Sequence, residues 1–193
     1  MENKYSALTH YEFLRLCIHS EALGLEREFT WGRVFRRYLR NRHIRFQIKW
    51  RFAHYFYAKG GKFNVKFANW LNDRITERYN VEIGLSAVIG PGFRIGHHNG
   101  IVIASIARIG SNFMISQNTT IGIKDKGDGY IVIGDNVKIG ANSCIISDNM
   151  KIGNNVIVGA QTFLNKDLAD DVICFTKREY TIITRSDVPE SAA

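Results

Sequence analysis

The chain has 193 residues, 45% of them apolar, and a formal net charge of +8, as in a globular protein able to bury a core. No secretory segment and no apolar run of ~18 residues occurs, so we expect no membrane span. The three cysteines, Cys17, Cys144 and Cys174, are an odd number without metal-ligand spacing. We therefore expect a reducing cytoplasmic location and no metal site.

The first 78 residues are expected to form a helical N-terminal domain with an uneven charge. Residues 31–78 hold 13 of the 26 Lys and Arg side chains but only two acids, Asp73 and Glu77. A basic block of this kind is either a solvated helix face or a surface for nucleic acid, anionic lipid or a phosphorylated substrate. Charge alone, without a recognised binding motif, does not indicate nucleic acid, and we expect no such partner.

One helix in this region is predicted to run up to Gly60 and Gly61, which end it. Its apolar side chains lie roughly along one face: Ile44, Ile48, Phe52, Tyr55 and Phe56. Basic side chains surround this face: Arg42, Arg45, Lys49 and Arg51. Two alternatives follow. The face packs on neighbouring helices or on the rest of the protein, or the helix rests peripherally on the anionic inner face of a membrane.

A six-residue repeat dominates the chain after residue 79. Eleven of its thirteen aliphatic positions are Ile, nine of the twelve gaps between them are six residues, and nine positions are followed by Gly. The positions are 83, 89, 95, 103, 109, 115, 121, 133, 139, 145, 152, 158 and 164. An amphipathic helix repeats at 3.6 residues and would not tolerate so many glycines.

Each hexad is therefore interpreted as one short strand and a corner, with the aliphatic residue facing inward and Gly or Asn supplying the turn. Three hexads make one triangular coil, and coils stack at a spacing of roughly 4.8 Å. The repeat predicts a mainly β fold: a parallel β-helix over 79–172, between the helical domain 1–78 and a tail 173–193.

Three interruptions of the period are candidate functional segments. They are an H-H-N-G insertion between Ile95 and Ile103, a K-D-K-G-D-G loop from Lys124 to Gly129, and one extra residue between Ile145 and Ile152. The first insertion holds His97 and His98, which are the only histidines beyond residue 54. A neutral imidazole suits the removal of a hydroxyl proton near neutral pH. If the protein transfers acyl groups to a hydroxyl, its base is His97 or His98.

From residue 48 to about 172 the sequence resembles the hexapeptide-repeat acyltransferases. That resemblance implies a left-handed parallel β-helix, a homotrimer and acetyl-CoA as co-substrate. The stretch from Tyr79 to Ile103 looks like the serine acetyltransferase branch, whose base opens an H-x-x-G-I-V motif. This likeness selects His97 as the catalytic base and assigns Glu82 to orient its imidazole, and we assign His98, Asn99 and Tyr130 to the acceptor.

The sequence also departs from that branch. Gly96 replaces an aspartate that binds the amino acid, no histidine follows His98, and Tyr130 stands near where the later histidine would fall. A second likeness is to the acetyltransferases of bacterial colanic-acid and capsule clusters. They share a W/Y-R-x-A-H helix motif, matched by Trp50, Arg51, Ala53 and His54.

The resemblance further implies that the pantetheine arm of CoA follows small residues, here Gly122, Ala141 and Ala160. Lys166, Lys177 and Arg178 are then candidates for the nucleotide phosphates. The usual G-x-P-A-K ending of the family is replaced by C-F-T-K-R-E-Y, from Cys174 to Tyr180.

Together these features predict an acetyl-CoA-dependent O-acetyltransferase of a capsular or exopolysaccharide hydroxyl, or of its lipid-linked precursor, with direct transfer and no metal. Two alternatives stay open: a divergent serine O-acetyltransferase, and a non-catalytic β-helix that serves as a binding or scaffold subunit.

Overall fold

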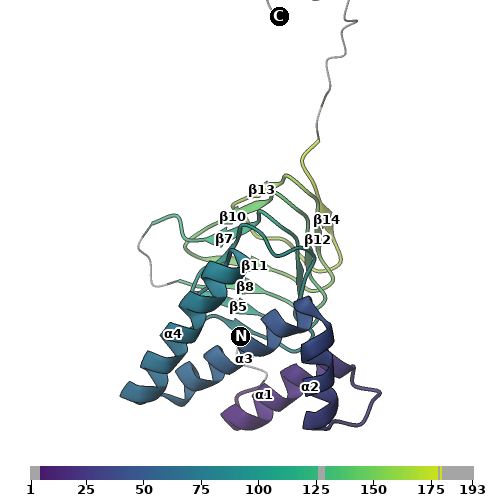
Figure 1. The fold of residues 1–193 in the computed structure, drawn as a ribbon. Coiled ribbons are helices and arrows are strands. Elements are labelled where there is room, and N and C mark those ends of the chain that lie inside the picture. Colours follow the sequence, from purple (N-terminus) through teal and green to yellow (C-terminus); the bar gives the residue numbers. More distant parts are fainter. Residues whose placement is uncertain (1–4, 126–128, 178, 180–193) are drawn as a thin grey trace, which may run out of the picture.

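A computed structural model of the chain describes residues 5–125, 129–177 and 179. Helices gather at one end of the molecule, and a tapering stack of short strands rises from them (Figure 1). The first strands, close to the helices, hold the insertion with the two histidines, and β13 and β14 lie at the far end.

The helical region consists of α1 (His10–Ile18), a π-helix η1 (His19–Leu23), α2 (Trp31–Arg40), α3 (Arg42–Lys59) and α4 (Lys62–Tyr79). Side-chain caps begin several of them: Thr9 and Glu12 form a capping box, Thr30 caps α2 and Asn41 caps α3. As predicted, Gly60 ends α3, at a φ of 71° that favours glycine.

The strands form three parallel sheets, one on each side of a solenoid of about five turns. The β1 sheet contains β1 (Val81–Ile83), β4 (Ile101–Ile103), β7 (Thr120–Gly122), β10 (Cys144–Ile146) and β13 (Phe163–Leu164). The β2 sheet contains β2 (Val88–Ile89), β5 (Ala107–Ile109), β8 (Ile131–Ile133) and β11 (Met150–Ile152). The β3 sheet contains β3 (Arg94–Ile95), β6 (Met114–Ile115), β9 (Lys138–Ile139), β12 (Ile157–Val158) and β14 (Ile173–Cys174).

All thirteen aliphatic positions of the repeat are buried, which confirms the predicted inward column. The register stacks isoleucine on isoleucine: Ile83 pairs with Ile103, and Ile103 pairs with Ile121 in the next coil. Burial of each such side chain stabilises the fold by roughly 1.5–3 kcal/mol. The parallel solenoid predicted from the hexad is therefore confirmed.

The turns differ from the prediction in one respect. The left-handed conformation at the corners falls mostly on asparagines, with φ of 51–59° at Asn80, Asn112, Asn118, Asn136, Asn142 and Asn155. Most of the glycines that follow these isoleucines serve close packing instead: a Cβ on Gly90 would lie 2.7 Å from the Gly110 carbonyl carbon of the next coil. The corner asparagines also bond along the stack, as in Asn112 to Asn136 at 3.0 Å.

A buried ion pair attaches the helices to the first coil. Arg51 of α3 pairs with Glu21 of η1, and both side chains are almost fully buried. Arg51 also donates to the carbonyls of Ile89 and Gly90, at 2.7 and 2.8 Å. The backbone N–H of Phe93 donates to Glu21 at 3.2 Å. These bonds fix α3 and η1 against the segment that immediately precedes the histidine insertion.

Candidate active site

His97 and His98 lie in the turn between β3 and β4, on the first coil of the solenoid. The turn is closed by a hydrogen bond from the backbone N–H of Asn99 to the carbonyl of His97, at 3.1 Å. Gly100 follows with a φ of 60°. The side chain of His97 is exposed, whereas that of His98 is half-buried. The two candidates for the base are therefore separated by their surroundings.

The ring of His98 packs toward the helices rather than outward. Its centroid lies 4.8 Å from the rings of His43 and Phe46 and 5.4 Å from that of Tyr79. Its Nε2 is buried and has no hydrogen-bond partner among the described residues. Burial, and then the positive neighbours His43 and Arg42, lower the pKa of His98 to about 4. His98 is therefore held neutral against the helices, and His97 is the more exposed of the two histidines.

Glu82, predicted to orient His97, is exposed on β1. In the register it pairs with Val102 of β4, which follows directly after the histidine turn. Within the described part of the chain no hydrogen bond or ion pair joins Glu82 to His97. The strand of Glu82 is thus paired with the strand that follows the turn of His97. The role of Glu82 stays a prediction.

Asn99, predicted to contact the acceptor, bonds to other corner asparagines, and its role toward an acceptor stays a prediction. Asn80 donates to its Oδ1 at 2.8 Å, and its own amide donates to Asn118 at 3.5 Å. Its backbone carbonyl accepts from the N–H of Asn118 at 2.8 Å. Asn80 and Asn118 thus hold the turn that carries His97. Sequence reasoning missed them, although the recurrence of Asn at the corners was the available signal.

Tyr130, the other predicted acceptor contact, is 47% exposed and precedes β8 of the β2 sheet. The guanidinium of Arg108 lies 4.6 Å from the centre of its ring. Arg108 in turn donates to the carbonyls of Ser86 and Ser105, at 3.1 and 3.2 Å. Within one chain, Tyr130 therefore contacts the β2 sheet and not the histidine turn.

Two of the small residues predicted to line the CoA arm are stacked at one corner. The backbone N–H of Gln161, next to Ala160, donates to the carbonyl of Ala141 at 2.8 Å. Ala160 is exposed, and Ala141 is half-buried. Gly122 lies on the β1 sheet, at the end of β7. Its carbonyl accepts from the N–H of Ser147 at 3.2 Å.

The cations predicted to meet phosphates lie near the last coil. Lys166 lines a hollow of about 520 Å³ with residues 167–169 and 172–175. Lys177 is exposed. Arg178 lies outside the described residues.

The helix motif that suggested the capsule enzymes has a structural role in this fold. Trp50, Arg51 and Ala53 are buried, and Arg51 forms the ion pair to Glu21. Burial, and then the nearby charge of Arg51, lower the pKa of His54 to about 4. Ile44 and Ile48, on the predicted apolar face of α3, are buried in a cluster with residues of α1, η1 and α2. This face therefore packs on neighbouring helices, which is the first of the two alternatives.

The described residues include no group of three His, Cys, Asp or Glu side chains that could hold a metal ion. Among the helices of the described ranges, none combines the length and the apolar character that crossing a membrane requires.

No protein-family model matches the chain. Several curated proteins to which the chain is similar are serine acetyltransferases. Serine acetyltransferase 1, chloroplastic, of Arabidopsis thaliana is 40% identical over 78 residues, which cover 39% of this chain and 25% of the relative. Serine acetyltransferase 3, mitochondrial, of the same plant is 37% identical over 100 residues, which cover 51% of this chain and 25% of the relative. The chain thus spans about a quarter of the length of these relatives.

Solved structures give the same result over more of the chain. The soybean serine acetyltransferase apoenzyme matches with a TM-score of 0.71 at 27% identity, over 86% of this chain and 67% of that one. Serine acetyltransferase isoform 3 of Entamoeba histolytica, in complex with cysteine, also has a TM-score of 0.71, at 25% identity, over 91% and 61%. These matches confirm the predicted fold class, a left-handed parallel β-helix with a small N-terminal helical region.

The same comparisons correct the predicted acceptor. The two curated relatives and the two solved structures described above are serine acetyltransferases, so the prediction of a capsular or exopolysaccharide hydroxyl is wrong. That prediction gave too much weight to the W/Y-R-x-A-H motif, which here attaches a helix to the solenoid. It also relied on two departures from the serine acetyltransferase branch: Gly96 in place of an aspartate, and the absence of a later histidine. These departures concern only two positions of the turn and loop.

Proposed function

We propose that the protein is an acetyl-CoA-dependent serine O-acetyltransferase in which His97 is the general base. The observation that carries this proposal is an exposed histidine at the interruption of a solenoid whose named relatives are serine acetyltransferases. A cytoplasmic location is part of the proposal, and the three free cysteines support it.

The chemistry needs one proton transfer and one acyl transfer. The imidazole of His97 takes the proton of the serine hydroxyl, and the oxygen attacks the carbonyl carbon of the acetyl thioester. The carbon–sulfur bond then breaks, and the CoA sulfur leaves with the proton returned from the imidazolium. Glu82 serves as the positioning residue that holds the imidazole and stabilises its charged form. No covalent enzyme intermediate is formed.

The co-substrate is proposed to lie along the corner of Ala141 and Ala160. Their short side chains leave main-chain groups accessible to the pantetheine arm. Gly122 is assigned to the same arm, and Lys166 and Lys177 to the phosphates, which the exposure of both lysines supports. A lysine ammonium binds phosphate as a point charge. Arg178 retains the same proposed role.

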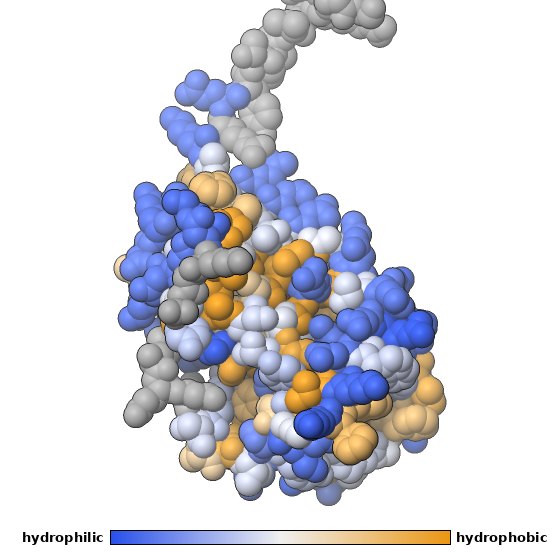
Figure 2. Space-filling model, turned by 90° about the vertical axis from the view of Figure 1, so that its left-hand side faces the viewer, coloured by the Kyte–Doolittle hydropathy of each residue, from blue (hydrophilic) through white to orange (hydrophobic). Residues whose placement is uncertain are grey.

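We further propose a homotrimer, with the site completed by a neighbouring subunit. Large apolar side chains are exposed on the last coils: Ile157 at 40%, Phe163 at 62% and Ile173 at 67%. Apolar side chains are visible on the coils above the helices in Figure 2. Exposed apolar patches of this kind are typical of subunit interfaces. A trimer would cover these side chains. In it, residues of the neighbouring subunit would enclose the exposed His97 from the second side.

The product identifies the reaction. The enzyme is incubated with acetyl-CoA and serine, thiol release is followed, and the acetylated amino acid is identified by mass spectrometry. The expected result is O-acetylserine formed in step with free CoA. Thiol release that is the same with and without serine would contradict the proposal and favour a non-catalytic solenoid.

A further inference from the structure

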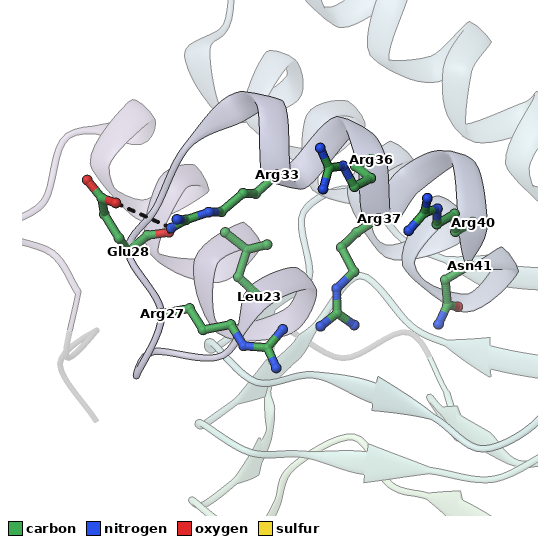
Figure 3. Close-up of a pocket in the computed structure, with 8 residues that line it drawn as sticks. All are labelled: Leu23, Arg27, Glu28, Arg33, Arg36, Arg37, Arg40 and Asn41. Carbon is green, nitrogen blue, oxygen red and sulfur yellow. Dashed lines mark hydrogen bonds and ion pairs between the residues drawn. The ribbon is translucent and has the colours of Figure 1, made fainter.

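A hollow lined by arginines lies in the helical region, outside the solenoid. Its volume is about 840 Å³, and its walls come from η1, the segment after it, and α2 (Figure 3). The lining residues are Leu23, Arg27, Glu28, Arg33, Arg36, Arg37, Arg40 and Asn41. Volumes of this size are typical of sites for small molecules.

The arginines converge because of helical spacing. Arg33, Arg37 and Arg40 follow one another on α2 at spacings of four and three positions, and Arg36 stands four positions before Arg40, so all four share one side of the helix. Arg27 comes from the segment after η1. In Figure 3, its guanidinium and that of Arg37 extend into the same space.

The positive charge of the hollow is not balanced by the protein. Glu28 is the one acid among the lining residues, and it pairs with Arg33 at 3.3 Å. In the part of the chain that the structure describes, no ion pair or hydrogen bond involves the side chains of four of the lining arginines: Arg27, Arg36, Arg37 and Arg40. Like charges held this close repel one another, so an anion in the hollow would stabilise the fold.

Asn41 adds a neutral donor at the end of the hollow. Its Oδ1 accepts from the backbone N–H groups of His43 and Ile44, at 2.9 and 3.3 Å, and so caps α3. That geometry leaves the amide NH₂ group to donate. The hollow thus offers guanidinium forks and an amide, which are donors suited to phosphate oxygens.

We propose that this hollow binds an anion with at least two phosphate groups, either free in solution or as the headgroup of an acidic lipid. Four guanidiniums without protein partners among the described residues, those of Arg27, Arg36, Arg37 and Arg40, carry more positive charge than one phosphate balances. The side of α2 away from the arginines exposes Phe35 at 62%, next to the exposed Leu39 at 59%. These side chains would contact the acyl region if the phosphates belong to a lipid. The site is independent of the proposed acetyl transfer.

The test compares two pairs of substitutions that remove equal charge. Arg37→Gln with Arg40→Gln removes two cations from the hollow. Lys62→Gln with Lys66→Gln removes two exposed cations from α4, outside it. Binding of tripolyphosphate is measured by titration calorimetry, and binding to phosphatidylcholine vesicles with and without cardiolipin is measured by sedimentation. A Lys166→Gln variant reports any occupation of the proposed CoA phosphate site.

The arginine pair is expected to weaken binding of one of these probes at least about 10-fold, while the α4 pair and Lys166→Gln change it less than about 2-fold. Tripolyphosphate binding identifies a soluble ligand. Binding to cardiolipin vesicles without tripolyphosphate binding identifies a lipid. Equal weakening by both pairs, or no binding of either probe, would overturn the proposal. A purely structural role at the α2 C-terminus would lower Tm without a selective change in Kd.

Discussion

His97 and His98 are adjacent, yet their surroundings give them different chemistry. His98 packs on Phe46 and Tyr79, and burial first of all lowers its pKa to about 4, whereas His97 is exposed. Residue type and spacing alone left both as candidates, because the direction of a side chain in a turn depends on contacts distant in sequence. The motif H-x-x-G-I-V selected His97, and the packing of His98 on α3 and α4 supports that choice.

Glu82→Gln tests the proposed positioning role. We expect kcat to fall by about 10-fold or more, because the neutral amide no longer stabilises the imidazolium. KM for acetyl-CoA and Tm should stay unchanged, since Glu82 is exposed. Steady-state kinetics and thermal unfolding measure these quantities. Glu77→Gln, at another exposed acid close in sequence, is the control, and an equal loss of kcat in both variants would exclude a specific role for Glu82.

His54 predicts how stability depends on pH. Burial, first of all, lowers its pKa from 6.5 to about 4, so the unfolded chain takes up the proton before the folded protein does. Its contribution to stability is therefore complete above about pH 6.5 and is lost as the pH falls toward 4.

Between pH 7 and pH 5 this residue should reduce the free energy of unfolding by about 2 kcal/mol. Urea unfolding at the two pH values measures the loss, and His54→Gln, which cannot be protonated, should show a smaller one. The assignment fails if the variant loses as much stability as the wild type.

Among the elements, the repeat predicted the core because inward-facing aliphatic residues recur mostly every six positions, so residues about one coil apart stack on each other. Ile83, Ile103 and Ile121 stack as the hexad requires. The attachment of the helices was not predictable in the same way. Glu21 and Arg51 are distant in sequence and come together only in the folded chain. Glu21 lies on η1, whose sequence has no local pattern that predicts a π-helix. The corner asparagines were predictable as turn residues, but their bonds between coils require the register.

The Glu21 and Arg51 pair should be essential to the attachment of the helices. Arg51→Met leaves a buried carboxylate without its partner, which should cost about 3–5 kcal/mol of unfolding free energy. Denaturant unfolding measures this cost. Arg74→Met, which breaks an exposed pair with Glu77, should cost less than about 1 kcal/mol.

The double variant Glu21→Leu with Arg51→Met removes both charges, and it should recover much of the lost stability. If Arg51→Met costs no more than Arg74→Met, the buried pair does not hold the helices to the first coil.

At the scale of the whole molecule, the chain combines two surfaces of different character. The helical part is basic, and the far coils of the solenoid expose apolar side chains. The charge imbalance was evident from the sequence. The place where the basic side chains gather could not be predicted, because the hollow forms only when α2 packs next to the segment after η1.

The proposed trimer predicts the effect of charge on the far coils. Ile157 and Ile173 are paired across β12 and β14 and are both exposed in the single chain. Glutamate at both positions should leave the fold intact but dissociate the trimer and reduce activity, because two buried carboxylates would be unpaired in the interface. Analytical ultracentrifugation measures the assembly, and Phe63→Glu, at a 91% exposed residue of α4, is the control. A trimer that persists in the double variant would place the interface elsewhere.

If His97 removes the proton of the serine hydroxyl, kcat/KM for serine at saturating acetyl-CoA depends on its imidazole. His97→Ala should lower kcat/KM by about 100-fold or more, since positioned bases contribute at least that much. His98→Ala, at the packed histidine, should lower it far less in protein that remains folded. Turnover of serine by His97→Ala at the wild-type rate would show that His97 is not the base.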